Sequence, residues 1–384
     1  MSINQPLKLG FDINSFQIES TSVSRYNSLQ DCQLKGVLDA KGEEKLLAYS
    51  IDNVLGILIH ELMEDSLYDD FPNTEEEIKN LFEEKIKSEE LKLNDDDLLS
   101  PFLPLKRTKD FAIKKIKVIR NAMAEHKNSE NNLLRRGHAS SVNTNRALGP
   151  EVNLNIVDED SNIRIKGKID KVSKDETNQI VITDYKSGEV HDENGELKKF
   201  YKDQLEIYAA IYLKQFEKRP SRLRVENLKK KKEEWNFNEN SSKKLYENCI
   251  QQIKDLNYKL ISEDNDVLNE ILCDTSESGC RFCPYKPKCK KFIKKIDCMT
   301  REQLIEEKNI YGKFIQVIPH EEDASINIVK IDSNGAEFSI WLREEEKHPD
   351  FKNLPEGAKI AFFNLRMNQG KFVEKASTRS YFYE

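Results

Sequence analysis

Two aspartates and a lysine near the middle of the chain are the residues best suited to chemistry. Asp170 lies in the run IRIKGKID, and Asp184 and Lys186 lie in VITDYKSG. The β-branched residues before Asp184 predict a strand. Side chains alternate along a strand, so Asp184 and Lys186 should point to the same face. The turn-rich SKDETN between the two runs predicts a hairpin loop that brings Asp170 close to Asp184.

Two carboxylates at such range repel each other unless a cation or a proton lies between them. Mg²⁺ prefers hard oxygen ligands and commonly binds through one or two carboxylates plus a substrate phosphate. Lys186 beside that phosphate could orient an attacking water or offset charge on the pentavalent phosphate. The three residues therefore indicate phosphodiester hydrolysis. A lone D-x-K also fits a simple salt bridge on an exposed strand face.

The hydrophobic patterns around these residues predict a mixed α/β core. Helical patterns cover residues 20–66, 73–135, 201–216 and 241–261. Strand patterns cover residues 151–157, 162–172, 179–186 and 221–228. Asp170 is expected to end its strand, and Ser22 or Ser24 is expected to cap the first helix.

From about residue 310 the sequence pattern is different: it predicts five short strands separated by turn signals. This pattern predicts a small OB-like β-barrel over residues 305–384. Such barrels bind single strands by stacking bases on aromatic residues. The candidates are Phe338, Trp341, Phe362, Phe363, Phe372, Tyr381 and Phe382. Most of them are expected in the core, and docking of another protein is an equal alternative. The basic tract at 106–120 is another candidate for phosphate contacts, although an amphipathic surface helix also explains it.

Composition and length limit the class of protein. The chain has 384 residues, 34% of them charged, and a net charge of -7 at pH 7. This acidity argues against electrostatic coating of nucleic acid but allows a local basic groove. No run is long enough to span a membrane, and the start MSINQPLKLGFDIN lacks the features of a signal peptide. We therefore expect a cytoplasmic protein without a membrane partner, whose seven cysteines are core residues or metal ligands.

The residues around the two aspartates also resemble the motif of a known protein family. GKIDKV…VITDYKSG closely resembles the core motif of PD-(D/E)XK nucleases, in the branch that includes the RecB and AddB nuclease domains and Cas4. That branch carries G-x-x-D and, after a spacer, D-Y-K-[TS]-G, which Gly167, Asp170 and residues 184–188 match. The resemblance implies a restriction-endonuclease-like mixed sheet. It also implies that Asp170 and Asp184 bind Mg²⁺ or Mn²⁺, aided by the Tyr185 carbonyl, and that Lys186 positions the water or stabilises charge.

Further elements of the branch follow in order along the chain. His60 in GILIHELMED, four residues after Gly56, matches a histidine that the family uses as an additional metal ligand. Gln204 and Tyr208 match its Q-x-x-x-Y motif, which by resemblance supports the site and contacts the DNA backbone. Glu151 matches a glutamate that the branch often carries near the site. An isolated helical histidine or an ordinary amphipathic helix would look the same.

The cysteines form a second constellation. Cys280, Cys283 and Cys289 give the spacing C-x2-C-x5-C, which places thiolates on one metal centre. Zinc with Cys273 as fourth ligand is the generic interpretation. The branch includes members with an iron–sulfur cluster whose fourth cysteine lies far upstream, where this chain has Cys32, followed by Gln33 instead of the usual proline. The resemblance thus implies a [4Fe–4S] cluster on Cys32, Cys280, Cys283 and Cys289. Cys249 is expected in the core, and Cys273 and Cys298 are spare.

Taken as a whole, the resemblance implies a RecB/Cas4-like nuclease domain over residues 1–298, with a helical insertion at about 66–140 and the cysteine segment at 273–298. Its activity would be a Mg²⁺- or Mn²⁺-dependent deoxyribonuclease on single-stranded DNA or DNA ends, with exonuclease favoured over endonuclease. DNA repair or defence against foreign DNA would be its setting. No G-x-x-x-x-G-K-[ST] occurs, so a helicase or other partner would feed it substrate. The alternative is a non-catalytic DNA-binding or scaffold subunit.

Overall fold

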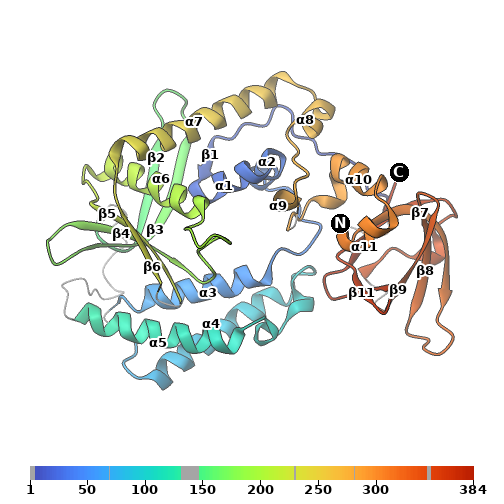
Figure 1. The fold of residues 1–384 in the computed structure, drawn as a ribbon, viewed down its shortest axis with the longest axis horizontal. Helices are drawn as coiled ribbons and strands as arrows, with labels where there is room; N and C mark the ends of the chain where they lie inside the picture. Colours follow the sequence, from blue (N-terminus) through green and yellow to red (C-terminus); the bar gives the residue numbers. More distant parts are fainter. Residues whose placement is uncertain (1–4, 69, 131–146, 229–230, 281, 344–346) are drawn as a thin grey trace.

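The computed structural model describes residues 5–68, 70–130, 147–228, 231–280, 282–343 and 347–384 (Figure 1). The last part of the predicted insertion, residues 131–140, lies outside these ranges. Figure 1 shows a large α/β body and a smaller β body that contains the C-terminus. Within the described ranges, no helix is both long and apolar enough to cross a bilayer.

The larger body is built on a mixed six-stranded sheet. Its strands are β1 (Ser20–Ser22), β2 (Gly149–Val157), β3 (Arg164–Lys174), β4 (Ile180–Lys186), β5 (Arg222–Asn227) and β6 (Lys232–Asn236). β3 pairs in parallel with β1 and antiparallel with β2 and β4. β4 pairs in parallel with β5, and β5 pairs antiparallel with β6. The mixed α/β core predicted from the sequence is therefore present.

The hairpin of β3 and β4 differs from its prediction at one point. Asp170 does not end its strand, because β3 continues to Lys174 and residues 171–174 pair with residues 180–183. Ser173 and Lys174 look like turn residues in the sequence. Pairing with β4 nevertheless satisfies the backbone groups of this segment, as a ladder does for any residue type.

The first predicted helical region contains three helices and one short strand. The helices are α1 (Val23–Asp31), α2 (Gln33–Lys41) and α3 (Ile51–Asp65). Ser22 is the N-cap of α1, since its hydroxyl accepts a hydrogen bond from the Arg25 backbone N–H at 3.1 Å. Residues 20–22 were expected to be helical, and this is wrong. They pair with residues 164–166, a partner too distant along the chain for any local pattern to indicate.

Helices cover the larger sheet in two groups (Figure 1). In the first, α6 (Lys199–Phe216) contacts β2, β4 and β5, and α7 (Glu239–Ser262) packs on α6. In the second, α3 contacts β3 and β4 and packs with α4 (Glu75–Leu93) and α5 (Phe111–Glu130). The Tyr185 side chain belongs to the apolar cluster of this second group. Strand β4 thus carries the Asp184–Lys186 segment between the two helical layers.

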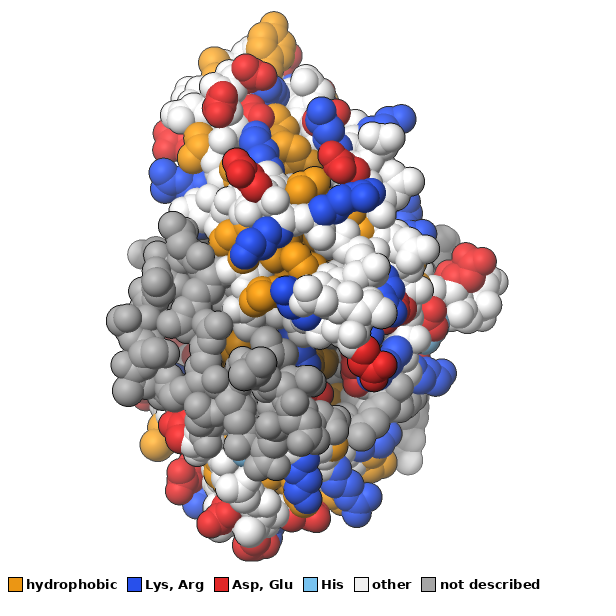
Figure 2. Space-filling view, turned by 90° about the vertical axis from the view of Figure 1, so that its left-hand side faces the viewer, with side chains coloured by type: hydrophobic (Ala, Val, Ile, Leu, Met, Phe, Trp, Pro, Cys, Tyr) orange, Lys and Arg blue, Asp and Glu red, His pale blue; other side chains and the backbone are white. Residues whose placement is uncertain are grey.

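The basic tract at 106–120 lies in η2 (Leu105–Arg107) and in α5, after η1 (Ser100–Phe102). Two of its lysines form ion pairs, one with α3 and one with α4 of the insertion. Lys114 Nζ lies 2.8 Å from Asp52 Oδ1 on α3, and Lys115 forms an ion pair with Glu83 on α4. These pairs support the interpretation of α5 as an amphipathic surface helix. On the face in Figure 2, the described basic and acidic side chains likewise interleave.

The C-terminal body is a seven-stranded sheet. Its strands are β7 (Ile310–Pro319), β8 (Asn327–Ser333), β9 (Ala336–Leu342), β10 (Lys359–Phe363), β11 (Arg366–Asn368), β12 (Lys371–Val373) and β13 (Arg379–Tyr383). They lie in the order β11-β12-β9-β8-β7-β10-β13. Between the described strands no ladder joins the two outer strands, so a closed barrel is not confirmed. Five of the predicted aromatics are buried in the core, whereas Trp341 and Phe382 are half-buried.

Short elements connect the two bodies: α8 (Asn265–Ile271), α9 (Glu277–Cys280), η3 (Lys286–Lys288), α10 (Lys290–Asp297) and α11 (Arg301–Glu307), with η5 (Phe351–Asn353) within the C-terminal body. Side chains of β13 then bind the larger body directly. The Tyr381 hydroxyl donates to the Leu46 carbonyl at 2.7 Å, and Arg379 donates to the Asp97 carbonyl at 2.6 Å. The Tyr383 hydroxyl donates to the Pro287 carbonyl at 3.0 Å. These bonds hold the C-terminal sheet against the larger body, its insertion and the connecting element η3.

Candidate active site

The register of the β3–β4 hairpin sets the two aspartates opposite each other. Lys171 pairs with Thr183, so the next facing positions are Asp170 and Asp184. Both side chains are buried. Burial raises the pKa of Asp184, and the charge of Asp170 raises it further while Lys186 opposes the shift. The two carboxylates therefore interact unfavourably, as the sequence predicts for a pair that a cation would neutralise.

Lys186 lies beside Asp184, with its Nζ 2.7 Å from Asp184 Oδ2. Burial lowers the pKa of Lys186, but the charge of Asp184 and its hydrogen bond outweigh burial, so the pKa lies above its ordinary value. The Tyr201 ring on α6 also faces this ammonium, 5.0 Å from Nζ to the ring centroid. Lys186 is thus a cation held in place by a carboxylate and an aromatic face.

Asp170 is held from two sides. Its Oδ2 accepts a hydrogen bond from the Tyr185 backbone N–H at 2.6 Å. The same oxygen lies 3.5 Å from Nδ1 of His60 on α3. Helix α3 comes this close because Gly56 lacks a side chain: a Cβ there would lie 3.1 Å from Ser187 Oγ. The helix and the hairpin thereby bring His60, Asp170, Asp184 and Lys186 to one place.

Gln204 and Tyr208 lie on α6 next to this group. The Gln204 side-chain amide donates to the Tyr208 hydroxyl at 3.2 Å, and both side chains are buried. Burial raises the pKa of Tyr208, whose hydroxyl also interacts with Asp184, Lys186 and Asp170. The pair thus packs beside the charged residues, in a position suited to supporting them.

Sequence reasoning missed Glu64, which lies one helical turn after His60. Burial raises the pKa of Glu64 to about 9, and the neighbouring Glu151 contributes to the rise. Lys168 Nζ lies 3.6 Å from Glu64 Oε2 and also forms an ion pair with Glu151. The expected Glu151 is therefore a half-buried residue paired with the buried Glu64, which also interacts with Asp170. The i, i+4 spacing from His60 was the signal that could have found Glu64.

The residues fit a divalent cation by the chemistry of their donors. Two carboxylates supply hard oxygens and the His60 imidazole supplies a nitrogen, a set that Mg²⁺ or Mn²⁺ accepts. In the part of the chain that the structure covers, no group of three or more His, Cys, Asp or Glu is already arranged as a metal site. Asp184 instead pairs with Lys186, and Asp170 with the Tyr185 N–H.

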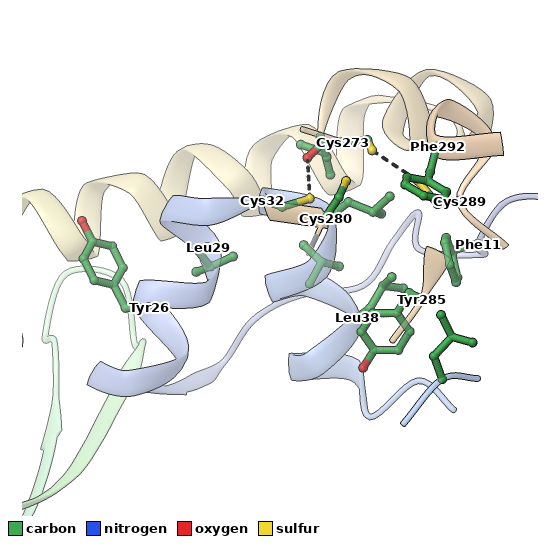
Figure 3. Packing of buried hydrophobic residues seen from close by; sticks show 14 of the residues in the cluster. Phe11, Tyr26, Leu29, Cys32, Leu38, Cys273, Cys280, Tyr285, Cys289 and Phe292 are labelled. Atoms are coloured by element: carbon green, nitrogen blue, oxygen red, sulfur yellow. Dashed lines mark hydrogen bonds between the residues drawn. The ribbon is translucent and has the colours of Figure 1, made fainter. Parts of the chain in front are cut away.

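Five cysteines line one small cavity of about 20 Å³. This cavity shares no lining residue with the group of Asp170, Asp184 and Lys186. Its thiols come from Cys32, at the junction of α1 and α2, and from Cys273, Cys280, Cys283 and Cys289. Figure 3 shows the labelled thiols converging from these segments, and Cys273 Sγ lies 3.3 Å from Cys289 Sγ. Cys249 is buried in α7 and Cys298 is exposed.

Cys273 was expected to lie outside the ligand set. Its thiol instead contacts two of the predicted ligands, Cys32 and Cys289. A hydrogen bond from Cys273 lowers the pKa of Cys32 to about 6. The Asp274 backbone N–H also points to Cys32 Sγ at 3.5 Å. Thiolates are the soft donors that iron–sulfur clusters and Zn²⁺ take, but among the described residues these five are not arranged as a metal site.

A mixed sheet that carries two aspartates and a lysine on adjoining strands is consistent with a nuclease fold. A family model described as the PD-(D/E)XK nuclease superfamily matches residues 20–290. The chain belongs to this superfamily, and membership indicates a nuclease. No curated protein matches the chain. A solved structure called "Crystal structure of SSO0001" is similar over 72% of this chain and 88% of that chain, with 11% identity and a TM-score of 0.28, which is too weak a likeness to carry an argument.

Proposed function

We propose that the chain is a metal-dependent nuclease that hydrolyses phosphodiester bonds in DNA. The observation that carries the proposal is the convergence of Asp170, Asp184 and Lys186 on the β3–β4 hairpin, with His60 added by α3. Acidic residues and a fixed cation at one place are what hydrolysis of a phosphodiester requires.

Each residue has a role that follows from its contacts. Mg²⁺ or Mn²⁺ held by Asp170, Asp184 and His60, with the Tyr185 carbonyl, would supply Lewis-acid activation of the scissile phosphate. Lys186 keeps its positive charge at neutral pH and offsets negative charge on the phosphate oxygens. The Tyr185 N–H fixes Oδ2 of Asp170. Gln204 and Tyr208 support the group from α6.

We also propose that the chain belongs to the RecB/AddB/Cas4-like branch and carries a [4Fe–4S] cluster on Cys32, Cys280, Cys283 and Cys289. The support is that these thiols, far apart in the sequence, line one cavity. A cluster bound there would tie the start of α2 to the segment before α10 and stabilise the fold. Zn²⁺ is the alternative, and Cys273 is placed to serve as a ligand in either case.

The substrate we propose is single-stranded DNA or DNA ends, with the C-terminal sheet as an OB-like module. Two features of that sheet support the module: β7 pairs with β10 over its first half and with β8 over its second, and β9 pairs in parallel with β12. An exonuclease, fed by a helicase in DNA repair or in defence against foreign DNA, is the setting that the family resemblance favours.

Cleavage of labelled single-stranded DNA tests the proposal. Purified protein is incubated with Mg²⁺, Mn²⁺ or EDTA, and Asp184→Asn is compared with Asp160→Asn, an exposed aspartate in the β2–β3 loop. We expect wild-type and Asp160→Asn to cut with either cation, and Asp184→Asn to be inactive. Wild-type cleavage no greater than that of Asp184→Asn would favour the non-catalytic scaffold alternative. Substrates with blocked ends distinguish exonuclease from endonuclease action.

A further inference from the structure

A second cavity, of about 620 Å³, lies where four parts of the chain meet. Its lining comes from the segment that leads from α2 into α3, from η1, from the cysteine segment with α10 and α11, and from the loops that follow β10 and β12. Figure 1 shows α9 and α11 in this region, between the two sheets. The cavity shares no lining residue with the group around Asp184.

The charge of this cavity is positive. Four lysines line it, Lys286, Lys295, Lys308 and Lys375, against two glutamates, Glu306 and Glu307. Burial lowers the pKa of Lys375, and the charges of Lys308 and Lys286 lower it further. Like charges brought together out of water destabilise one another unless an anion joins them. An anionic group in this space would be attracted to Lys308 and Lys375, whereas Lys295 Nζ donates to the Thr275 carbonyl at 3.2 Å and Lys286 Nζ lies 5.3 Å from the Phe292 ring centroid.

Aromatic side chains lie beside these lysines. Tyr49, Phe102 and Phe282 line the same cavity. The Phe282 side chain is 63% exposed, whereas Cys280 and Tyr285 of the same segment are buried. An exposed ring next to cations is the arrangement that binds single-stranded nucleic acid, because a base stacks on the ring while the lysines bind its phosphate.

We propose that this cavity binds a nucleotide phosphate of a single-stranded nucleic acid, with Lys308 and Lys375 at the phosphate and Phe282 against a base. The volume agrees, since sites for small ligands measure about 300–1,000 Å³. The inference deepens the proposed function, on which it rests, by naming a place where the substrate strand is held. A free mononucleotide has the same chemistry, but a site between the two bodies favours a strand that passes through.

The choice of residues for the test follows from their position. Lys286 also lines the cysteine cavity, whereas Lys308 and Lys375 do not. The variant Lys308→Gln/Lys375→Gln therefore removes two charges without touching the thiols. Its matched control is Lys313→Gln/Lys352→Gln, which removes two exposed lysines from the same C-terminal body, outside the cavity.

Binding is measured by fluorescence anisotropy with a labelled single-stranded 20-mer across a salt series. All proteins carry Asp184→Asn, so that no strand is cut, and circular dichroism and thermal unfolding check that each is folded. We expect the cavity variant to bind about tenfold more weakly than the control and its log–log salt slope to be shallower by about 0.7, from the one phosphate that the two lysines share. Equal affinity and slope for the two double variants would overturn the proposal.

Two further experiments test the role of Phe282 and distinguish a nucleic-acid strand from a free nucleotide. Phe282→Ala should weaken binding severalfold while Phe282→Trp restores it; equal binding by both would remove the stacking role. Millimolar thymidine monophosphate or inorganic phosphate should fail to displace the strand. Displacement that depends on Lys308 and Lys375 would overturn the strand in favour of a free nucleotide. Because these assays need no cleavage, an inactive protein that still binds through the cavity would contradict the proposed nuclease and not this inference.

Discussion

The Tyr208 ring on α6 occupies the space that a side chain on Gly167 of β3 would need. A Cβ at Gly167 would lie 2.5 Å from Tyr208 Cε1, closer than two carbon atoms can approach. The glycine of the G-x-x-D motif and the tyrosine of the Q-x-x-x-Y motif are thus two halves of one contact. This contact seats α6 against the strand that carries Asp170.

Gly167→Ala should therefore destabilise the fold by about 1–3 kcal/mol through overpacking. Chemical denaturation measures the change. In a Tyr208→Leu background, which frees the space, the added cost of Gly167→Ala should fall to near zero. Gly188→Ala is the matched control, because a Cβ there meets nothing within 4 Å. Equal losses at Gly167 and Gly188 would contradict the packing argument.

The interaction of the buried Glu64 with the half-buried Glu151 should make stability depend on pH. Burial, and then Glu151, raise the pKa of Glu64 from 4.5 to about 9 in the folded state. A raised pKa stabilises the fold fully below about pH 4.5, and this stabilisation is lost as the pH rises toward 9.

Glu64→Gln should remove this dependence. Between pH 5 and pH 8.5 the wild type should lose at least about 1.4 kcal/mol more unfolding free energy than Glu64→Gln, the equivalent of one pKa unit. Denaturant titrations at the two pH values test it. Glu61→Gln, on the same helix beside Lys85, should keep the wild-type slope. An unchanged slope in Glu64→Gln would show that Glu64 is not the group responsible.

The cysteine cavity predicts both a cofactor and its ligands. Protein purified without oxygen should be brown and hold about four iron atoms per chain. Cys32→Ser should lose most of the iron, while Cys298→Ser, at an exposed position, should retain it. Retention in Cys32→Ser together with loss in Cys273→Ser would make Cys273 the fourth ligand. Colourless protein that contains zinc would rule out the cluster.

Tyr201 should position Lys186 rather than take part in the reaction. Its ring lies over the Lys186 ammonium, a contact of about 0.5–2 kcal/mol. Tyr201→Ala should lower kcat by about 2- to 30-fold, as that range implies, with little change in KM. Tyr201→Phe, which keeps the ring, should retain wild-type kcat. Loss of activity in the phenylalanine variant would instead assign a role to the hydroxyl.

The sequence predicted those parts of the fold whose signals are local. The β3–β4 hairpin has β-branched strands and a polar loop, and α6 and α7 have strong apolar periodicity, so each could be read from a few residues. β1, β11 and β12 have three residues each. Such short segments are defined by their partners rather than by their own pattern, and β1 was therefore expected to be helical.

The residues of the candidate site were likewise predictable where their spacing is local, and were missed where they meet through tertiary packing. The spacing of Asp184 and Lys186 places them on one face of a strand, and the structure brings them within 2.7 Å. Glu64 was missed because it reaches Glu151 on β2 through tertiary packing. Cys273 was named only as the fourth ligand of the zinc alternative, and its contact with Cys289 likewise depends on packing. Pairing of Glu64 with Glu151 depends on where the chain returns many residues later.

The most direct test of the central claim is the single-turnover rate at which labelled single-stranded DNA is cut in Mg²⁺ by Lys186→Ala and by Lys174→Ala, an exposed lysine at the end of β3. If Lys186 stabilises charge at the phosphate, its loss should slow cleavage by about 100-fold or more, while Lys174→Ala cuts at the wild-type rate. Cleavage by Lys186→Ala at the wild-type rate would contradict a catalytic role for this lysine.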